Sequence, residues 1–172
     1  MSPPKIQIAF QGGGAKFLAM LPVAHAFCEC QKGEIIAISA VAGTSAGAIC
    51  AALVAADCDF DKLRTYVKHE GKTHLNRLIP SDALKLAERI HARHINIFDV
   101  FQSRNKLSSI FKNGLPVLNE EEFGAFLDKL LKCCSHGDKE IEQIPKTKLS
   151  ITATNLSKTC GVTFSRGSIK KP

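Results

Sequence analysis

The sequence has few aromatic residues and no tryptophan. Aromatics make up 6% of the 172 residues, there is a single tyrosine, and the basic residues are dispersed along the chain. Nucleic-acid-binding surfaces usually combine a basic stripe with aromatic side chains. The formal net charge of +7 is also compatible with acidic lipid headgroups or with plain solubility. We therefore expect no nucleic-acid partner.

The chain also lacks the paired cysteine spacings of a disulfide framework. Its seven cysteines are an odd number, which favours reduced thiols in a cytoplasmic protein. Cys28 and Cys30 would point to different faces of a helix, and no C-x-x-C pair accompanies them. His91 and His94 could share a helix face, but no nearby cysteine or acidic pair completes a ligand set. No metal or organic cofactor is predicted.

A long leucine-rich hydrophobic run is missing as well. The uncharged stretch Ile35–Ala56 is long enough to cross a bilayer, but it is rich in small residues and fits a buried strand followed by a buried helix. Phe17–Ala26 imitates a signal-peptide core. The triple glycine upstream and the few basic residues at the start argue against a signal peptide. We expect transient association with an anionic membrane surface, without insertion.

Two strand–glycine–helix units open the sequence. Lys5–Phe10 reads as a strand that runs into a glycine loop, and Ala15–Gln31 follows as a helix. Ile35–Ala42 is a second strand, and Ala46–Ala56 continues as an alanine-rich helix after another glycine-containing turn. This order predicts an α/β fold with a central, mostly parallel sheet and helices on both faces.

The remainder of the chain predicts more helices before it returns to strands. Residues 69–113 hold most of the histidines, and we interpret them as a surface-facing helical insertion. The expected helices are Phe60–His69, Ser81–Arg93 and Glu120–Cys133, the last with a capping box from Asn119 and Glu122, and the expected strands are Lys148–Thr154 and Gly161–Ser165.

The turn after the second strand fits the G-x-S-x-G pattern of a nucleophile elbow, with Gly43-Thr44-Ser45-Ala46-Gly47. In such an elbow a sharp turn lifts the serine out of the sheet, small neighbours allow close backbone approach, and the helix N-terminus favours developing negative charge. Ser45 is therefore the candidate nucleophile. The competing interpretation is an ordinary small-residue turn.

The loop after the first strand carries Gly12, Gly13 and Gly14. Because it opens a helix, its backbone N–H groups are free to point at an anion, as an oxyanion hole requires. A phosphate-binding loop is the alternative, but the third glycine of G-x-G-x-x-G is absent and no G-x-x-x-x-G-K-[ST] is present.

Together these motifs resemble the opening of the patatin-like phospholipase family. The strand and turn around Thr152-Ala153-Thr154-Asn155-Leu156, Gly161 and Phe164 are similar to that family's later strand, so the resemblance spans most of the chain. It implies a three-layer patatin-like fold and a serine esterase with a Ser-Asp dyad that cleaves phospholipids or other acyl lipids. By motif position it implies that Ser45 is the nucleophile, that Gly12, Gly13 and Gly14 form the oxyanion hole, and that Lys16 gives electrostatic or structural support.

The sequence departs from the family pattern at two points. Phe17 stands where the family usually has glycine, and no aspartate is followed by glycine, whereas the family's catalytic aspartate lies in a D-G-G or D-G-A motif. We therefore expect residues 1–172 to be a single patatin-like domain that is incomplete at its C-terminus. Serine without a proton acceptor is a poor nucleophile, so the isolated chain should be weakly active or inactive.

Two other interpretations remain open. In one, His136 completes a Ser-Asp-His triad with Asp99 or Asp128, although residues 135–138 look like a polar surface loop. In the other, the chain is a non-catalytic fragment or pseudoenzyme that binds lipid, a missing C-terminal segment or another subunit through an exposed sheet edge.

Overall fold

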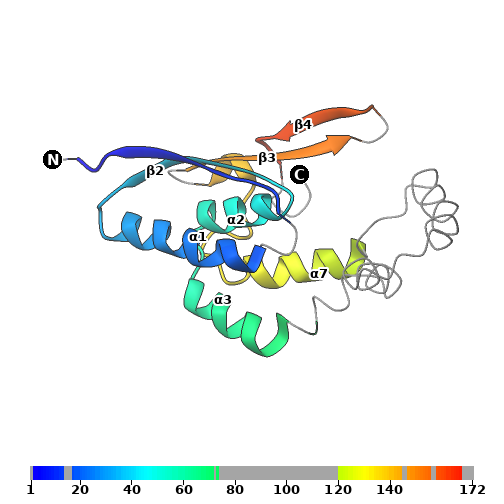
Figure 1. Ribbon diagram of the computed structural model, residues 1–172, viewed down its shortest axis with the longest axis horizontal. Coiled ribbons are helices and arrows are strands. Elements are labelled where there is room, and N and C mark those ends of the chain that lie inside the picture. The colour runs from blue at the N-terminus through cyan, green and yellow to red at the C-terminus, as the bar shows by residue number, and fades with distance from the viewer. Residues whose placement is uncertain are drawn as a thin grey trace, which may run out of the picture. The chain divides into compact units, whose positions relative to one another are not determined.

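A four-stranded sheet with the order β1-β2-β3-β4 forms the frame of the protein (Figure 1). Strand β1 (Lys5–Phe10) pairs in parallel with β2 (Ala37–Thr44), and β2 pairs in parallel with β3 (Lys148–Asn155). Strand β4 (Cys160–Phe164) pairs antiparallel with β3. In this computed structural model the described residues are 2–13, 17–71, 73, 120–144, 147–155 and 158–167.

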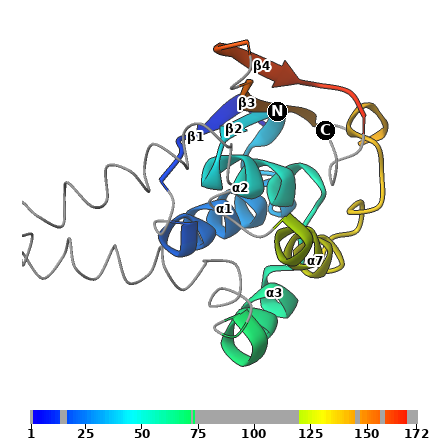
Figure 2. The ribbon, with the colours of Figure 1, turned by 90° about the vertical axis from the view of Figure 1, so that its right-hand side faces the viewer.

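Helices provide the crossovers that parallel strands require. Helix α1 (Phe17–Lys32) connects β1 to β2, and helix α2 (Ala46–Ala55) follows β2 directly. Helix α2 packs against β1, β2 and β3, and α1 packs against α2. Figures 1 and 2 show both helices on the same side of the sheet. The predicted α/β fold with a mostly parallel sheet is confirmed, while a helical layer on the opposite face is not among the described elements.

Helix α2 is buried on nearly all sides. It consists of alanine, glycine and other small or aliphatic residues, and Cys50, Ala51 and Leu53 are fully buried. A helix that is apolar all round fits a protein interior. The stretch Ile35–Ala56 is thus a strand and a buried helix, as predicted. Within the described residues, no helix has the length and apolar character needed to cross a membrane.

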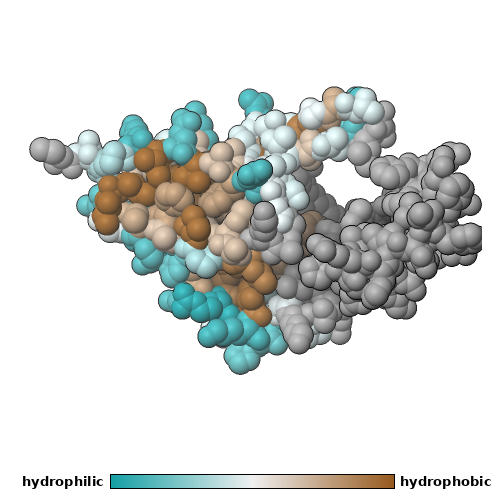
Figure 3. All heavy atoms as spheres, viewed as in Figure 1, coloured by the Kyte–Doolittle hydropathy of each residue, from teal (hydrophilic) through white to brown (hydrophobic). Residues whose placement is uncertain are grey.

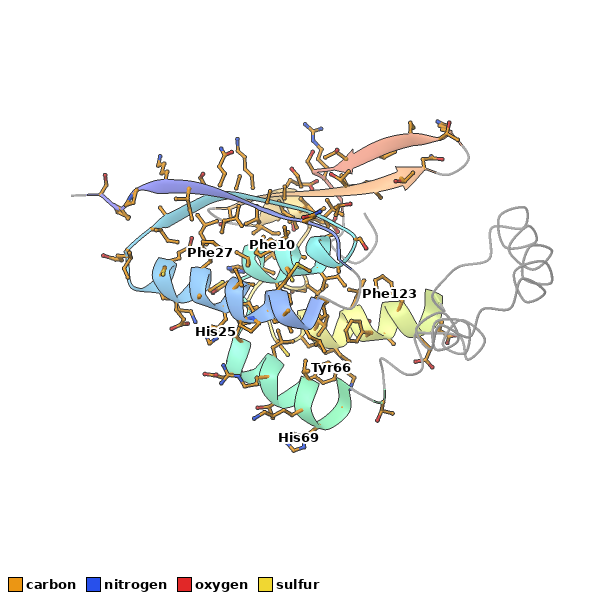
Figure 4. The ribbon with its side chains drawn as sticks, viewed as in Figure 1. Phe10, His25, Phe27, Tyr66, His69 and Phe123 are labelled. Carbon is orange, nitrogen blue, oxygen red and sulfur yellow. The ribbon has the colours of Figure 1, made fainter. Side chains whose placement is uncertain are left out.

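Helix α3 (Phe60–Tyr66) follows α2, with a π-helical turn at Val67–Gly71. Asp59 caps α3, because its Oδ1 accepts hydrogen bonds from the backbone N–H groups of Asp61 at 3.2 Å and Lys62 at 3.1 Å. His25 on α1 stacks on Phe60 with ring centroids 5.1 Å apart, and Figure 4 shows it directed toward α3.

Helix α7 (Glu120–Leu131) and the short helix η3 (Ile141–Gln143) precede β3. The chain divides into two compact units, one of residues 1–65 with 127–172 and the other of residues 66–126. The predicted helix Ser81–Arg93, the cap Asn119 and nearly all of the predicted insertion 69–113 lie outside the described residues. Those expectations stay predictions.

A short antiparallel bridge closes the C-terminal end of α2 against the segment after α7, pairing Cys58 with Cys134. The backbone N–H of Asp59 donates to the Cys133 carbonyl at 2.8 Å, and that of Ser135 donates to the Asp57 carbonyl at 3.1 Å. The bridge therefore joins two segments that are far apart in the sequence.

Candidate active site

Ser45 occupies a strained backbone conformation at the junction of β2 and α2. Its φ of 52° and ψ of −128° are unusual for a residue with a side chain. Its hydroxyl makes no capping hydrogen bond to the helix, although serine is a favoured N-cap residue, and the residue is exposed. Strain at an exposed, uncapped serine between a strand and a helix is the geometry of a nucleophile elbow.

The two glycines that flank Ser45 permit a very close backbone approach. A Cβ atom added to Gly43 would overlap the carbonyl of Gly47 and lie 2.6 Å from the nitrogen of Ala48. A Cβ atom added to Gly47 would overlap the carbonyl of Phe10 and lie 2.6 Å from that of Gln11. Any larger residue at either position would push the first turn of α2 away from the strands.

The glycine loop lies directly against the elbow. A Cβ atom added to Gly12 would stand 3.3 Å from both the Ser45 Cβ and the Thr44 carbonyl oxygen. The ladder between β1 and β2 explains this proximity, because Phe10 is paired with Gly43. Figure 4 shows Phe10, which is buried, between the sheet and α2. The loop thus begins beside the serine as soon as β1 ends.

Two of the predicted oxyanion residues, Gly12 and Gly13, are among the described residues, whereas Gly14 and Lys16 lie outside them. Helix geometry also leaves the N–H groups of Ala46 and Gly47 without intrahelical acceptors at the start of α2. The first turn is closed by the N–H of Ala48, which donates to the Ser45 carbonyl at 2.9 Å. The elbow therefore combines a nearby glycine loop with the positive end of a helix.

Strand β3 supports the elbow from its other side. Thr44 pairs with Thr152, and the Thr44 hydroxyl donates a hydrogen bond of 3.2 Å to the Thr152 carbonyl. Strands β1 and β2 therefore end together where Ser45 leaves the sheet, and β3 runs beside them for three residues more. The carboxyl ends of parallel strands are the usual place for a ligand in an open α/β sheet. The sequence did not predict this contact, since it joins residues more than 100 positions apart.

The predicted His136 triad does not form in the described structure. The backbone N–H of His136 donates to the Ala56 carbonyl at 3.0 Å, so His136 lies at the C-terminal end of α2. Ser45 lies at the N-terminal end, and a ten-residue helix separates the two by about 15 Å. Asp57 and Asp59 follow the same distant end. Of the two aspartates proposed for that triad, Asp128 lies on α7, and Asp99 lies outside the described residues.

The loop containing His136 is also more tightly packed than a free surface loop. Gly137 is buried, and a Cβ atom added there would overlap the carbonyl of Leu131. Among the described residues, no group of three or more histidine, cysteine, aspartate and glutamate side chains is arranged to hold a metal ion. The chemistry that this arrangement can support is nucleophilic attack by a serine hydroxyl.

Comparison with known proteins gives one family match. The description "Patatin-like phospholipase" matches residues 8–167. No curated protein matches the sequence significantly. Among solved structures, the chain is similar to the type III effector protein ExoU, with 21% identity and a TM-score of 0.44. That similarity covers 98% of this chain and 38% of the ExoU chain, so the present sequence spans well under half of ExoU.

Proposed function

The chain belongs to the patatin-like phospholipase family, whose members are lipid hydrolases, and we propose that its own reaction is hydrolysis of a lipid acyl ester with Ser45 as the nucleophile. The observation that carries the proposal is the strained, exposed backbone of Ser45 at the end of β2, with the backbone of Gly12 against it. The family match alone would not select a serine, and this geometry supports Ser45.

In the proposed reaction, the Ser45 Oγ attacks the ester carbonyl carbon as its proton passes to a base. The carbonyl oxygen becomes an oxyanion, which the N–H groups of Gly12, Gly13 and Gly14 stabilise together with the N-terminus of α2. Collapse of the tetrahedral intermediate expels the alcohol portion of the lipid and leaves an acyl-serine. Water then attacks the acyl-serine, releases the fatty acid and restores the hydroxyl.

The proposed reaction also requires a proton acceptor for the Ser45 hydroxyl. His136 is remote from Ser45, and none of the aspartates in the chain is followed by glycine. We propose that the 172-residue chain alone is weakly active, because an unactivated serine hydroxyl is a poor nucleophile. We propose electrostatic support as the role of Lys16, because of its motif position after the glycine loop.

Fatty-acid release from mixed phospholipid vesicles tests the proposal. The assay compares this chain with Ser45→Ala. Ser135→Ala, which changes an exposed serine near the C-terminal end of α2, serves as the matched control. We expect Ser45→Ala to abolish fatty-acid release and Ser135→Ala to leave it unchanged. Equal activity of both serine variants would rule out Ser45 as the nucleophile.

We further propose that the substrate is reached at a membrane surface, with α1 as the contacting element. The outer stripe of its first ten residues is uncharged and exposed, and it includes Leu18 at 46% and Val23 at 51% exposure. Figure 3 shows apolar residues gathered on the side that carries α1. Because α1 begins soon after the glycine loop, this stripe starts beside the proposed site. The net charge of +7 favours an anionic surface.

Vesicle sedimentation tests the membrane contact separately from catalysis. The Ser45→Ala protein should sediment with vesicles that contain phosphatidylserine, and Leu18→Glu with Val23→Glu should release it. Thr163→Glu on exposed β4 introduces the same type of charge elsewhere and should have a smaller effect. If Thr163→Glu releases the protein as fully as the α1 variants, binding depends on net charge and not on this stripe.

A non-catalytic binding role is the second candidate, and the sheet topology favours it in one respect. Strands β1 and β4 are the two edges of the described sheet, and an unpaired edge can accept a further strand. Covalent capture of Ser45 by a fluorophosphonate probe would support the enzyme. A folded protein that neither reacts with the probe nor releases fatty acid would support the binding role.

A further inference from the structure

Four cysteines gather at the C-terminal end of α2, far from Ser45. Cys58 is 1% exposed, Cys28 is 4% exposed, and Cys133 and Cys134 are half-buried. All four thiols are free. The reaction proposed for Ser45 uses none of them, and they do not form a metal site in the described part of the chain.

The backbone around Cys58 and Cys134 has the geometry that a disulfide requires. The two hydrogen bonds of the bridge run from Asp59 to Cys133 and from Ser135 to Asp57, one residue to each side of the cysteine pair. Cys58 and Cys134 therefore form a non-hydrogen-bonded antiparallel pair, in which the Cα atoms lie about 4.5 Å apart and the side chains are closest. That separation falls within the range of about 4.4–6.8 Å seen in disulfides.

The same geometry selects Cys134 over its neighbour. Cys134 is the bridge partner of Cys58, whereas Cys133 lies in the turn that follows α7. The Cys134 thiol donates a hydrogen bond of 3.7 Å to the Leu130 carbonyl, and it is near enough to Cys58 to raise the pKa of that thiol. The packed glycine at position 137 holds the following turn against the end of α7, which fixes the position of Cys134.

The buried thiols of Cys58 and Cys28 are protected from ionisation in the reduced protein. The hydrogen bond to Cys134 raises the pKa of Cys58, and burial raises it further. Burial is also the main cause that raises the pKa of Cys28 to about 12. Neutral buried thiols are slow nucleophiles. An oxidant should therefore react first at the more accessible Cys134.

We propose that Cys58 and Cys134 form a reversible disulfide when the protein is exposed to a peroxide oxidant. Hydrogen peroxide oxidises the Cys134 thiol to a sulfenic acid and is reduced to water. The Cys58 sulfur then attacks the Cys134 sulfur, the S–S bond forms, and the sulfenic hydroxyl leaves with the Cys58 proton as a second water. The two thiols together supply the two electrons, and a dithiol reductant reverses the reaction.

The disulfide would be a covalent cross-link at the C-terminal end of α2, away from Ser45. It would enclose residues 59–133, a loop that contains the whole unit of residues 66–126. Closing a long loop restricts the unfolded chain and so stabilises the folded one. Transient disulfides of this type are the usual form in reducing compartments.

Peptide mapping of the full chain tests the proposal. After treatment with hydrogen peroxide and digestion by trypsin without reductant, the peptide Gly33–Lys62 should be linked to Cys133–Lys139, with a loss of about 2 Da. The link should persist in Cys133→Ser and disappear in Cys134→Ser and Cys58→Ser. Cys133→Ser and Cys134→Ser make the same substitution at adjacent positions. Circular dichroism shows whether each variant is folded.

Thermal unfolding gives the second readout. Oxidation should raise the Tm of the original chain and of Cys133→Ser by about 4 °C or more, and dithiothreitol should restore the original value. Cys134→Ser, which changes only a half-buried side chain, should show no reversible rise. A link through Cys133 or Cys28, or sulfinic acid at Cys134 without any cross-link, would overturn the proposal.

Discussion

The two ends of helix α2 differ in almost every physical respect. At the N-terminal end, Ser45 is exposed and strained, and its neighbours are glycines in backbone contact with β1. At the C-terminal end, Cys58 is buried, and backbone hydrogen bonds pair its segment with the chain after α7. One end carries the proposed nucleophile, and the other holds the helix in place.

This difference shows how strain at a functional site is tolerated. An unfavourable backbone conformation persists only where surrounding structure fixes it. Helix α2 is fixed along its length by burial and at its far end by the Cys58–Cys134 bridge. The energy stored at Ser45 is therefore offset by packing elsewhere along the same helix. Four substitutions would break or sharpen this comparison.

The largest effect is expected from Gly47→Ala. The added methyl group would overlap backbone atoms of Phe10 and Gln11, which cannot move without disturbing β1. We expect the free energy of unfolding to fall by about 3 kcal/mol or more, measured by urea denaturation. Gly124→Ala in α7 is the control, since nothing lies within 4 Å of its added Cβ, and it should stabilise by about 0.5–1 kcal/mol. Similar losses at both glycines would contradict the close approach.

Ser45→Gly should stabilise the protein. Glycine adopts a positive φ without the steric cost that serine carries at φ 52°, and relief of that strain should outweigh the greater freedom of glycine in the unfolded state by about 1 kcal/mol. Ser45→Ala retains a Cβ atom and should leave stability nearly unchanged. Chemical denaturation of both variants tests this directly, and equal stability of the two would show that the Ser45 backbone is not strained.

Asp59→Ala removes the cap of α3 beside the Cys58 bridge. We expect Tm to fall by about 3 °C at pH 7. Hydrogen bonding, first from the Lys62 backbone, holds the pKa of Asp59 below its ordinary 3.8. The carboxylate therefore stabilises the fold above that value, and its contribution is lost as pH falls through the lowered pKa.

The difference in Tm between Asp59→Ala and the original chain should accordingly vanish near pH ~2. Asp61→Ala removes a neighbouring carboxylate that is 82% exposed and only pairs with Arg64, so it should change Tm little. A difference for Asp59→Ala that stays constant from pH 7 to pH ~2 would exclude capping by the carboxylate.

The smallest effect is expected from Thr44→Val, which removes one hydrogen bond and keeps the branched shape. The bond from the Thr44 hydroxyl to the Thr152 carbonyl is 3.2 Å long and exposed, so its loss should cost about 0.5 kcal/mol. Denaturant titration measures the loss. A loss of stability greater than that of Asp59→Ala would mean that β3 stabilises the elbow more than the geometry indicates.

Much of the first third of the fold could be predicted from sequence. Strand β1 matches its predicted bounds, and α2 matches to within one residue. Periodicity and glycine position suffice there because each element is bounded by residues that stop it. The second strand begins two residues later than predicted, at Ala37, because the chain is still turning after α1 at Gly33 and Glu34. The proposed roles of Ser45 and the glycine loop remain predictions that the geometry supports.

Contacts between distant segments could not be predicted in the same way. Nothing in the sequence near Cys58 indicates that it pairs with Cys134. Nothing near His136 indicates that its backbone N–H donates to the Ala56 carbonyl. Chain order alone permits His136 as a member of a triad. Only the direction of α2 shows that it lies at the wrong end.

The ladder that pairs Phe10 with Gly43 also bears on the order of folding. Gly12, Gly43, Ser45 and Gly47 all belong to the segment from β1 to α2, and their mutual contacts involve residues 10–48. These contacts close a smaller loop than the pairing of Thr44 with Thr152, which spans 108 positions, and so cost less chain entropy. We expect this segment to behave as one cooperative unit in hydrogen exchange, so the elbow can reach its final geometry before the chain after residue 126 is in place.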